Sequence, residues 1–165
     1  KPRGTGSVTT AMMKDLASDD DRQAATDSMV RLNKAASEVM VQLGAHAATD
    51  VTGFGLIGHG RQMAKESGVC LRMRLDCLPL LPGALHYAAQ GVKTGGGVSN
   101  RDYYEPWVDW GPANEPQVLL ACDPQTSGGL LIAMAADDAD EALVRMQELG
   151  AVSYTHLTLP TIHSV

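Results

Sequence analysis

The stretch Ala48–His59, ATDVTGFGLIGH, decides how the rest of this sequence is interpreted. It places a carboxylate, Asp50, directly before a segment in which Gly53, Gly55 and Gly58 recur. Glycines let a backbone approach a ligand closely, and the start of a following helix favours an anion. If Asp50 binds Mg²⁺, the metal supplies positive charge between this carboxylate and a nucleotide phosphate. We therefore predict that Asp50 is a metal ligand at the phosphate end of an ATP site.

The same stretch is open to two other interpretations. The glycines match the GxGxxG spacing of dinucleotide-binding folds, with Asp76 near the position of the ribose-binding acid. We reject that match because His46–Thr49 is small and polar where a buried parallel strand should be apolar. A purely structural Asp50, which caps or turns the chain, stays open as an alternative. Thr52 is expected to cap the following helix, and His59 is expected to be a structural histidine rather than a base.

Composition narrows the class of protein. The 165 residues suit one domain, and 13 basic against 19 acidic residues give a net charge of -6, which argues against a nucleic-acid partner. The longest apolar run, Leu130–Ala136, is far shorter than the roughly 20 residues of a membrane helix. Cys70, Cys77 and Cys122 are odd in number and form no CxxC pair, so no disulfide framework or structural zinc site is expected. We expect a cytoplasmic protein that does not enter a membrane.

Hydrophobic periodicity predicts helices and strands in one α plus β chain. Helices are predicted from about Thr9 to Leu16, from an Asp27 cap to Leu43, from Gly55 to Gly68, and from Asp137 to Leu149. Strands are predicted at Val69–Leu75, Val118–Ala121 and Leu130–Met134, and the stretch Lys93–Pro116 is predicted to be a long loop.

Two of these stretches also carry a family resemblance. ATDVTGFGLIGHG, followed by Met63 and then Ser67–Val69, resembles a signature of selenophosphate synthetase, also called selenide, water dikinase. Asp123–Leu131, DPQTSGGLL, resembles that family's other C-terminal signature, although by itself it favours a tight turn over a catalytic role. The same pattern, in the same order, is matched by the opening KPRGTG, by Ser28–Ala35 with its Leu32 and Asn33, and by the Gly95–Asn100 loop.

The resemblance implies an α+β fold like the C-terminal domain of aminoimidazole ribonucleotide synthetase, with a mixed β-sheet and helices packed mainly on one side. It implies a homodimeric enzyme that uses ATP, selenide and water to make selenophosphate, phosphate and AMP. Mg²⁺ would hold the ATP phosphates, with Asp50 as a ligand. The reactive cysteine or selenocysteine, its lysine and most ATP contacts would lie upstream of Lys1, because Cys70, Cys77 and Cys122 match no part of that motif.

Alternatives remain within the same superfamily. They are aminoimidazole ribonucleotide synthetase, thiamine-monophosphate kinase, the hydrogenase maturation factor that dehydrates a carbamoyl group, and a non-catalytic relative.

Both ends of the chain look unnatural. It begins without a methionine, so residues 1–150 are expected to be a C-terminal domain fragment that is inactive by itself. Residues 151–165 are expected to be a non-native tail. Within it, Ser153–Thr161, SYTHLTLPT, resembles the translation of a transposase adapter, which suggests read-through in sequence assembly. We exclude this tail from the fold.

Overall fold

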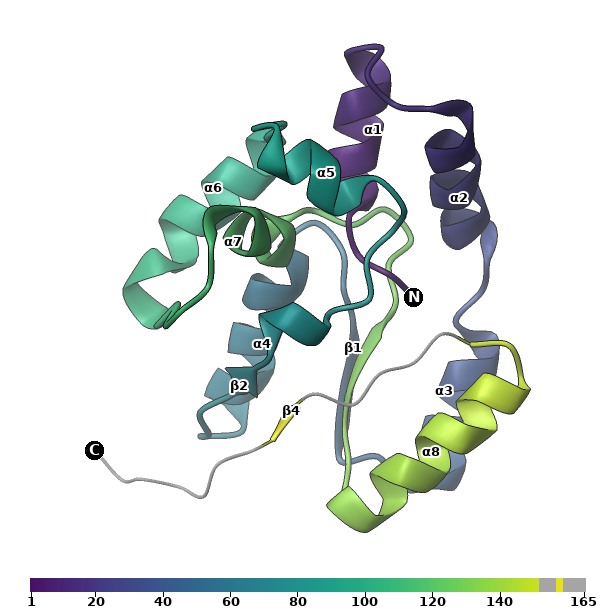
Figure 1. Ribbon diagram of the computed structural model, residues 1–165. Coiled ribbons are helices and arrows are strands. Elements are labelled where there is room, and N and C mark those ends of the chain that lie inside the picture. The colour runs from purple at the N-terminus through teal and green to yellow at the C-terminus, as the bar shows by residue number, and fades with distance from the viewer. Residues whose placement is uncertain (152–156, 159–165) are drawn as a thin grey trace.

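A short antiparallel strand pair lies between two groups of helices in the folded molecule (Figure 1). This computed structural model describes residues 1–151 and 157–158. The strands are β1 (Ala47–Asp50), β2 (Arg72–Met73), β3 (Leu130–Ala133) and β4 (Leu157–Thr158). The α-helices are α1 (Thr5–Met13), α2 (Asp19–Val30), α3 (Lys34–Gln42), α4 (Gly55–Glu66), α5 (Ala84–Ala89), α6 (Gly95–Tyr104), α7 (Glu115–Cys122) and α8 (Ala136–Glu148). The 3-10 helices are η1 (Leu75–Cys77) and η2 (Glu105–Trp107).

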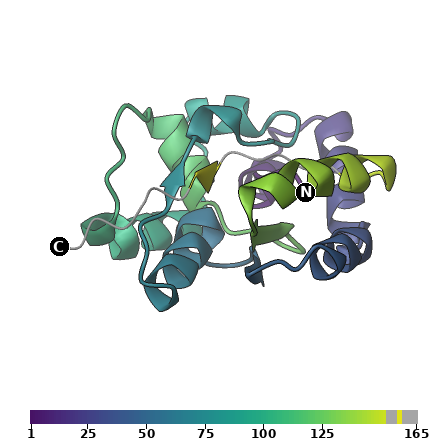
Figure 2. The ribbon, with the colours of Figure 1, turned by 90° about the horizontal axis from the view of Figure 1, so that it is seen from below.

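Helices cover both faces of the β1–β3 pair, as the view from below shows (Figure 2). Leu131 of β3 packs with Leu56 of α4 on one face. Its neighbour Ile132 packs with Val39 of α3 and Met146 of α8 on the other face, because successive strand residues point to opposite sides. The α+β class is confirmed, but the helices are not gathered mainly on one side as expected.

The strand pairing is mostly antiparallel in the part of the chain that the structure describes. In the central pair, Ala47 lies opposite Ala133 and Asp50 lies opposite Leu130. The second pair, β2 with β4, is also antiparallel. Parallel pairing is confined to an isolated bridge between Arg3 and Leu80, so the expected mixed sheet is reduced to this bridge beside antiparallel pairs.

Helix α7 forms the inner layer of the helical part and corrects one prediction. Val118–Ala121 was predicted to be a strand, but it lies within α7, where every residue from Val118 to Cys122 is buried. A short, continuously apolar run cannot be assigned to helix or strand by periodicity. The helix is started by Asn114 and Gln117, which form a reciprocal capping box.

The long helix predicted from Asp27 to Leu43 is two helices. Asp27 lies inside α2, whose N-cap is Ser18, and the chain leaves the helical conformation at Arg31 before α3 begins at Lys34. Apolar spacing suggested one core-facing helix, yet Leu32 is 78% exposed. The break directs residues 31–33 toward the central strands, where the candidate site lies.

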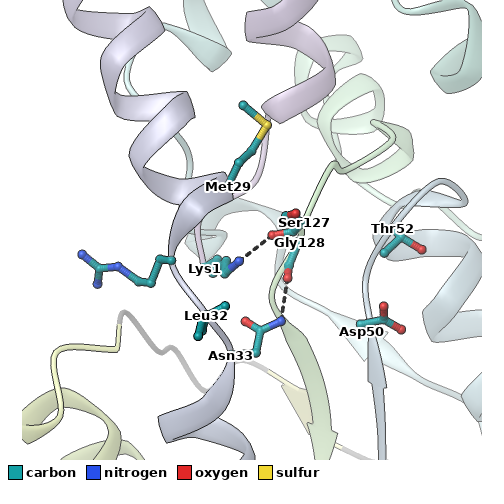
Figure 3. Close-up of a pocket in the computed structure, with 9 residues that line it drawn as sticks. Lys1, Met29, Leu32, Asn33, Asp50, Thr52, Ser127 and Gly128 are labelled. Carbon is teal, nitrogen blue, oxygen red and sulfur yellow. Dashed lines mark hydrogen bonds between the residues drawn. The ribbon is translucent and has the colours of Figure 1, made fainter.

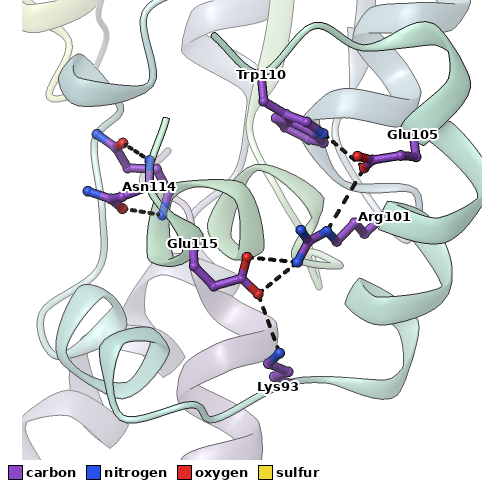
Figure 4. Close-up of polar contacts among 7 residues, drawn as sticks. Lys93, Arg101, Glu105, Trp110, Asn114 and Glu115 are labelled. Atoms are coloured by element: carbon purple, nitrogen blue, oxygen red, sulfur yellow. Dashed lines mark hydrogen bonds and ion pairs between the residues drawn. The ribbon is translucent and has the colours of Figure 1, made fainter. Parts of the chain in front are cut away.

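The stretch Lys93–Pro116 is not a loop throughout. It contains α6, which Thr94 caps by accepting a hydrogen bond from the Gly97 N–H at 2.9 Å. Its start is rich in glycine, which is a poor helix former, so sequence propensity concealed the helix. Figure 4 shows how Arg101 of α6 binds Glu115 at the start of α7, with Nη1–O distances of 2.7 and 2.8 Å. This ion pair joins the two helices.

The other predicted elements are placed close to their expected positions. Helices α4 and α8 and strand β3 confirm their predictions, and α1 begins earlier and ends earlier than expected. The predicted strand Val69–Leu75 is reduced to Arg72–Met73. In the described residues, no helix is long and apolar enough to cross a membrane. Apart from 151, 157 and 158, the predicted tail lies outside the described residues.

Candidate functional site

Asp50 lies exposed at the end of β1, beside a pocket of about 190 Å³ (Figure 3). The pocket is formed by four segments that are far apart in the sequence. Its lining residues are Lys1; Met29, Arg31, Leu32 and Asn33; Asp50 and Thr52; and Ser127 and Gly128. The fold therefore brings both signature stretches, the opening residue and the Ser28–Ala35 segment to one place.

The turn that contains Ser127 and Gly128 is the part to which the other segments are attached. Lys1 Nζ donates a hydrogen bond to the Ser127 carbonyl at 2.6 Å. Asn33 Nδ2 donates to the Gly128 carbonyl at 2.9 Å, as the dashed lines in Figure 3 show. The interruption between α2 and α3 at residues 31–33 thus brings Asn33 to this turn. Helical periodicity in the sequence could not indicate this contact.

Gly128 packs directly on the backbone of β1. An ideal Cβ at position 128 would lie 1.8 Å from the Val51 carbonyl oxygen, so no side chain fits there. The adjacent Gly129 carbonyl accepts a hydrogen bond from the Val51 N–H at 2.8 Å. Ser127 has a φ of 48°, a left-handed conformation that is strained for a residue other than glycine and is often found at functional sites.

His59 supports the backbone of the pocket from α4. The Thr52 N–H donates to His59 Nε2 at 3.1 Å, so that nitrogen is an acceptor and the ring is neutral. Burial lowers the pKa of His59, the charge of Asp50 raises it, and the charge of Arg3 lowers it. These contacts agree with the structural role expected for His59. Thr52 does not cap α4 as expected, because Phe54 is the N-cap residue and the Thr52 hydroxyl lies 3.3 Å from His59 Nε2.

Asp123 and Gln125, from the DPQTSGG stretch, anchor the start of the chain. The buried Asp123 carboxylate accepts hydrogen bonds from the Gly6 N–H at 3.0 Å and from Ser7 Oγ at 2.8 Å. Gln125 Nε2 donates to the same carboxylate at 2.8 Å, and Gln125 Oε1 accepts from the Gly4 N–H at 3.1 Å. Burial raises the pKa of Asp123 to about 6 against the effect of these bonds. The geometry supports a structural turn, and sequence reasoning missed its link to the opening segment.

Asp50 fits one ligand of a shared metal site rather than a complete site. Among the residues that line the pocket, it is the one acidic side chain. No group of three or more His, Cys, Asp or Glu side chains that could hold a metal occurs in the described residues. Mg²⁺ often binds one or two carboxylates and takes its other oxygens from water and phosphates. An exposed carboxylate at a pocket suits that mode of binding.

Comparison with known proteins assigns this chain to a family. Residues 1–154 match the family model described as AIR synthase related protein, C-terminal domain. The chain belongs to this family. The expected resemblance to selenide, water dikinases is confirmed as well, because relatives of this domain carry that name.

Three of these relatives show how much of each protein the AIR synthase-related domain covers. The selenide, water dikinase of Trichlorobacter lovleyi is 43% identical over 134 residues, 81% of this chain and 39% of that protein. The protein of the same name from Bordetella bronchiseptica is 44% identical over 150 residues, 91% and 43% of the two chains. That of Geobacter metallireducens is 39% identical over 167 residues, 100% and 49%. The chain therefore spans less than half the length of these relatives.

The cysteines of the AIR synthase-related domain lie away from the pocket. Cys70 is exposed, Cys77 is half-buried and Cys122 is buried in α7. Burial raises the pKa of Cys122 to about 12, which keeps this thiol protonated and unreactive. Lys93 also lies outside the pocket lining and pairs with Glu115 at 3.4 Å.

Proposed function

We propose that this AIR synthase-related domain is the C-terminal part of a selenide, water dikinase. Such an enzyme uses ATP, selenide and water to make selenophosphate, phosphate and AMP. The observation that carries the proposal is that both signature stretches meet at one pocket, with the Asp50 carboxylate exposed beside it. Relatives of this name, 39–44% identical in the three cases above, support the same assignment.

We further propose that Asp50 binds Mg²⁺ together with the phosphates of ATP. When bound, the metal would neutralise phosphate charge and so favour transfer of the γ-phosphoryl group. The residues of this chain would hold the site in shape. Lys1 Nζ adds positive charge next to Ser127, and the Thr52–His59 hydrogen bond fixes the backbone that follows Asp50.

The rest of the proposed active site belongs to the part of the relatives that this chain does not cover. We propose that it holds the reactive cysteine or selenocysteine, the lysine near it, most ATP contacts and the other metal ligands.

A cytoplasmic homodimer is proposed for the whole enzyme, with small molecules rather than nucleic acid as its substrates. Free cysteines at positions 70, 77 and 122 are compatible with a reducing compartment.

The proposed domain comprises residues 1–150, followed by a non-native tail of residues 151–165. The coding DNA after the codon for Ala151 tests this boundary. A match to a transposase adapter supports a foreign tail, whereas natural coding sequence without such a match contradicts it.

The family description is broader than the name of the relatives, so another ATP-using enzyme of the same superfamily is the second candidate. Sequencing the gene upstream of Lys1 separates the two. A cysteine or selenocysteine followed shortly by a lysine supports the selenium enzyme, and its absence supports the second candidate.

The direct test of the site is Asp50→Asn in the full-length enzyme. The variant keeps the size of the side chain but removes its charge, so we expect a loss of about 100-fold or more in selenide-dependent AMP release. A higher Mg²⁺ requirement should accompany the loss, measured by titrating the metal at fixed ATP.

Asp102→Asn is the matched control, because Asp102 is an exposed carboxylate of α6 that does not line the pocket. It should behave as wild type. Normal activity of Asp50→Asn at low Mg²⁺ would remove Asp50 from the metal site. A melting temperature of Asp50→Asn close to that of wild type would show that the fold is intact.

A further inference from the structure

Arg3 is a buried cation without a counter-ion in the described residues. Its exposed fraction is 7%, and its Nη1 atom is enclosed without a hydrogen-bond partner. No carboxylate of the described chain forms an ion pair with it. Burial lowers the pKa of Arg3 to about 10, so the side chain still carries its charge at neutral pH.

An unpaired buried charge is unfavourable, because its lost hydration is not replaced. Hydrogen bonds on both sides of Arg3 fix its backbone in this position. Its N–H donates to the Pro79 carbonyl at 2.7 Å, and its carbonyl accepts from the Leu81 N–H at 2.8 Å. The next residue, Gly4, is held by Gln125 at 3.1 Å. The chain therefore fixes a guanidinium in a place where it needs an anion.

The surroundings of Arg3 overlap with those of the candidate site. Arg3 follows Lys1 by two residues, and Lys1 lines the pocket beside Asp50. The charges of Arg3 and Asp50 both act on His59, which holds the Thr52 N–H. An ideal Cβ on Gly129 would lie 2.6 Å from the Lys1 backbone nitrogen, and the Gly129 carbonyl binds the Val51 N–H, so the segment that carries Arg3 begins beside the end of β1.

We infer that Arg3 is a phosphate-binding residue, whose guanidinium pairs with a phosphate group beside the site marked by Asp50. A guanidinium offers parallel N–H donors that match two oxygens of one phosphate. The choice of phosphate as the anion rests on the proposed function. The test uses neither ATP nor Mg²⁺, so its failure is separate from a failure of the Asp50 proposal.

The experiment uses the 165-residue chain with inorganic phosphate as the probe, at neutral pH and constant ionic strength. We expect phosphate to shift the side-chain Nε–Hε NMR signal of Arg3 and to raise the melting temperature. Arg3→Met should weaken phosphate binding by about tenfold or more, as expected for loss of a charge-assisted hydrogen bond. Arg72→Met, which removes an exposed arginine of β2, is the control and should bind phosphate like wild type.

Stability of the phosphate-free protein separates a ligand role from a structural one. If Arg3 is unpaired until an anion arrives, Arg3→Met should be as stable as wild type or more stable without phosphate. Marked destabilisation of the phosphate-free variant would show a structural arginine and overturn the inference. An unchanged Arg3 signal on addition of phosphate, or an equal effect of acetate, would also overturn it.

Discussion

At the scale of single residues, Asp123 shows how burial and hydrogen bonding oppose each other. The carboxylate accepts three hydrogen bonds from Gly6, Ser7 and Gln125, which favour its charged form. Burial has the larger effect and raises the pKa to about 6. The folded state therefore binds a proton more tightly than the unfolded state, in which the pKa is near 3.8.

This difference predicts how stability changes with pH. As pH rises from about 4 through 6, the Asp123 contribution should lower the free energy of unfolding by about 3 kcal/mol, at about 1.4 kcal/mol per pKa unit. Asp123→Asn does not titrate and should lack this decline. Urea denaturation of both chains across this pH range measures the difference. Asp102→Asn should retain the wild-type pH dependence, and parallel curves for wild type and Asp123→Asn would contradict the prediction.

His59 should act in the opposite direction. Its pKa is lowered in the fold, so the unfolded state takes up a proton first and stability is lost as pH falls through about 6.5. His59→Ala should remove this loss. It should also lower the free energy of unfolding at neutral pH by about 1–3 kcal/mol, because the Thr52 N–H loses its partner. Thermal unfolding at several pH values tests both effects, and an Ala variant as stable as wild type at neutral pH would argue against the support role.

At the scale of elements, the start of α7 is held by more than its own sequence. Asn114 and Gln117 cap the helix, and Glu115 in its first turn accepts hydrogen bonds from Arg101 and Lys93 (Figure 4). These interactions lower the pKa of Glu115, and Arg101 makes the largest contribution. A negative charge at this end also suits the helix dipole.

The cap itself can be tested by Asn114→Ala. The variant loses the side-chain oxygen that accepts from the Gln117 N–H at 3.1 Å, so we expect the free energy of unfolding to fall by about 1 kcal/mol. Equilibrium urea unfolding gives this value. Asn114→Asp keeps an accepting oxygen and should retain most of the stability, whereas equal losses for Ala and Asp would show that the cap is not the cause.

At the scale of the whole molecule, the pocket offers a single carboxylate, so the proposed metal site would need ligands from elsewhere. Asp50 is the one carboxylate among its lining residues, and the relatives are more than twice as long as the part this chain matches. We predict that the 165-residue chain releases no AMP from ATP, with selenide and Mg²⁺ present, when the full-length enzyme assayed in parallel does. AMP release in proportion to the concentration of the isolated chain would refute this prediction.

Local sequence features determined several parts of this protein. Helices α4 and α8 were predicted because each has one apolar face and a glycine just past its end. Strand β3 was predicted as a short, continuously apolar run that follows a turn. The isolated acid before the glycines singled out Asp50, which the structure places beside a pocket. Helix α7 was missed because every residue of its second half, Val118–Cys122, is buried, so this half lacks the polar face that distinguishes a helix from a strand.

Only the tertiary structure decided how the site is assembled. Two hydrogen bonds join segments that are distant in the sequence. Asn33, in the interruption between α2 and α3, binds Gly128 across 95 positions, and Gly4 binds Gln125 across 121 positions. Such pairs leave no periodic trace in the sequence, since each partner alone is an ordinary polar residue. The unpaired charge of Arg3 is of the same kind, because burial by distant segments creates it. The sequence alone thus singled out Asp50 as the candidate site residue, and the packing of distant segments determined the pocket that surrounds it.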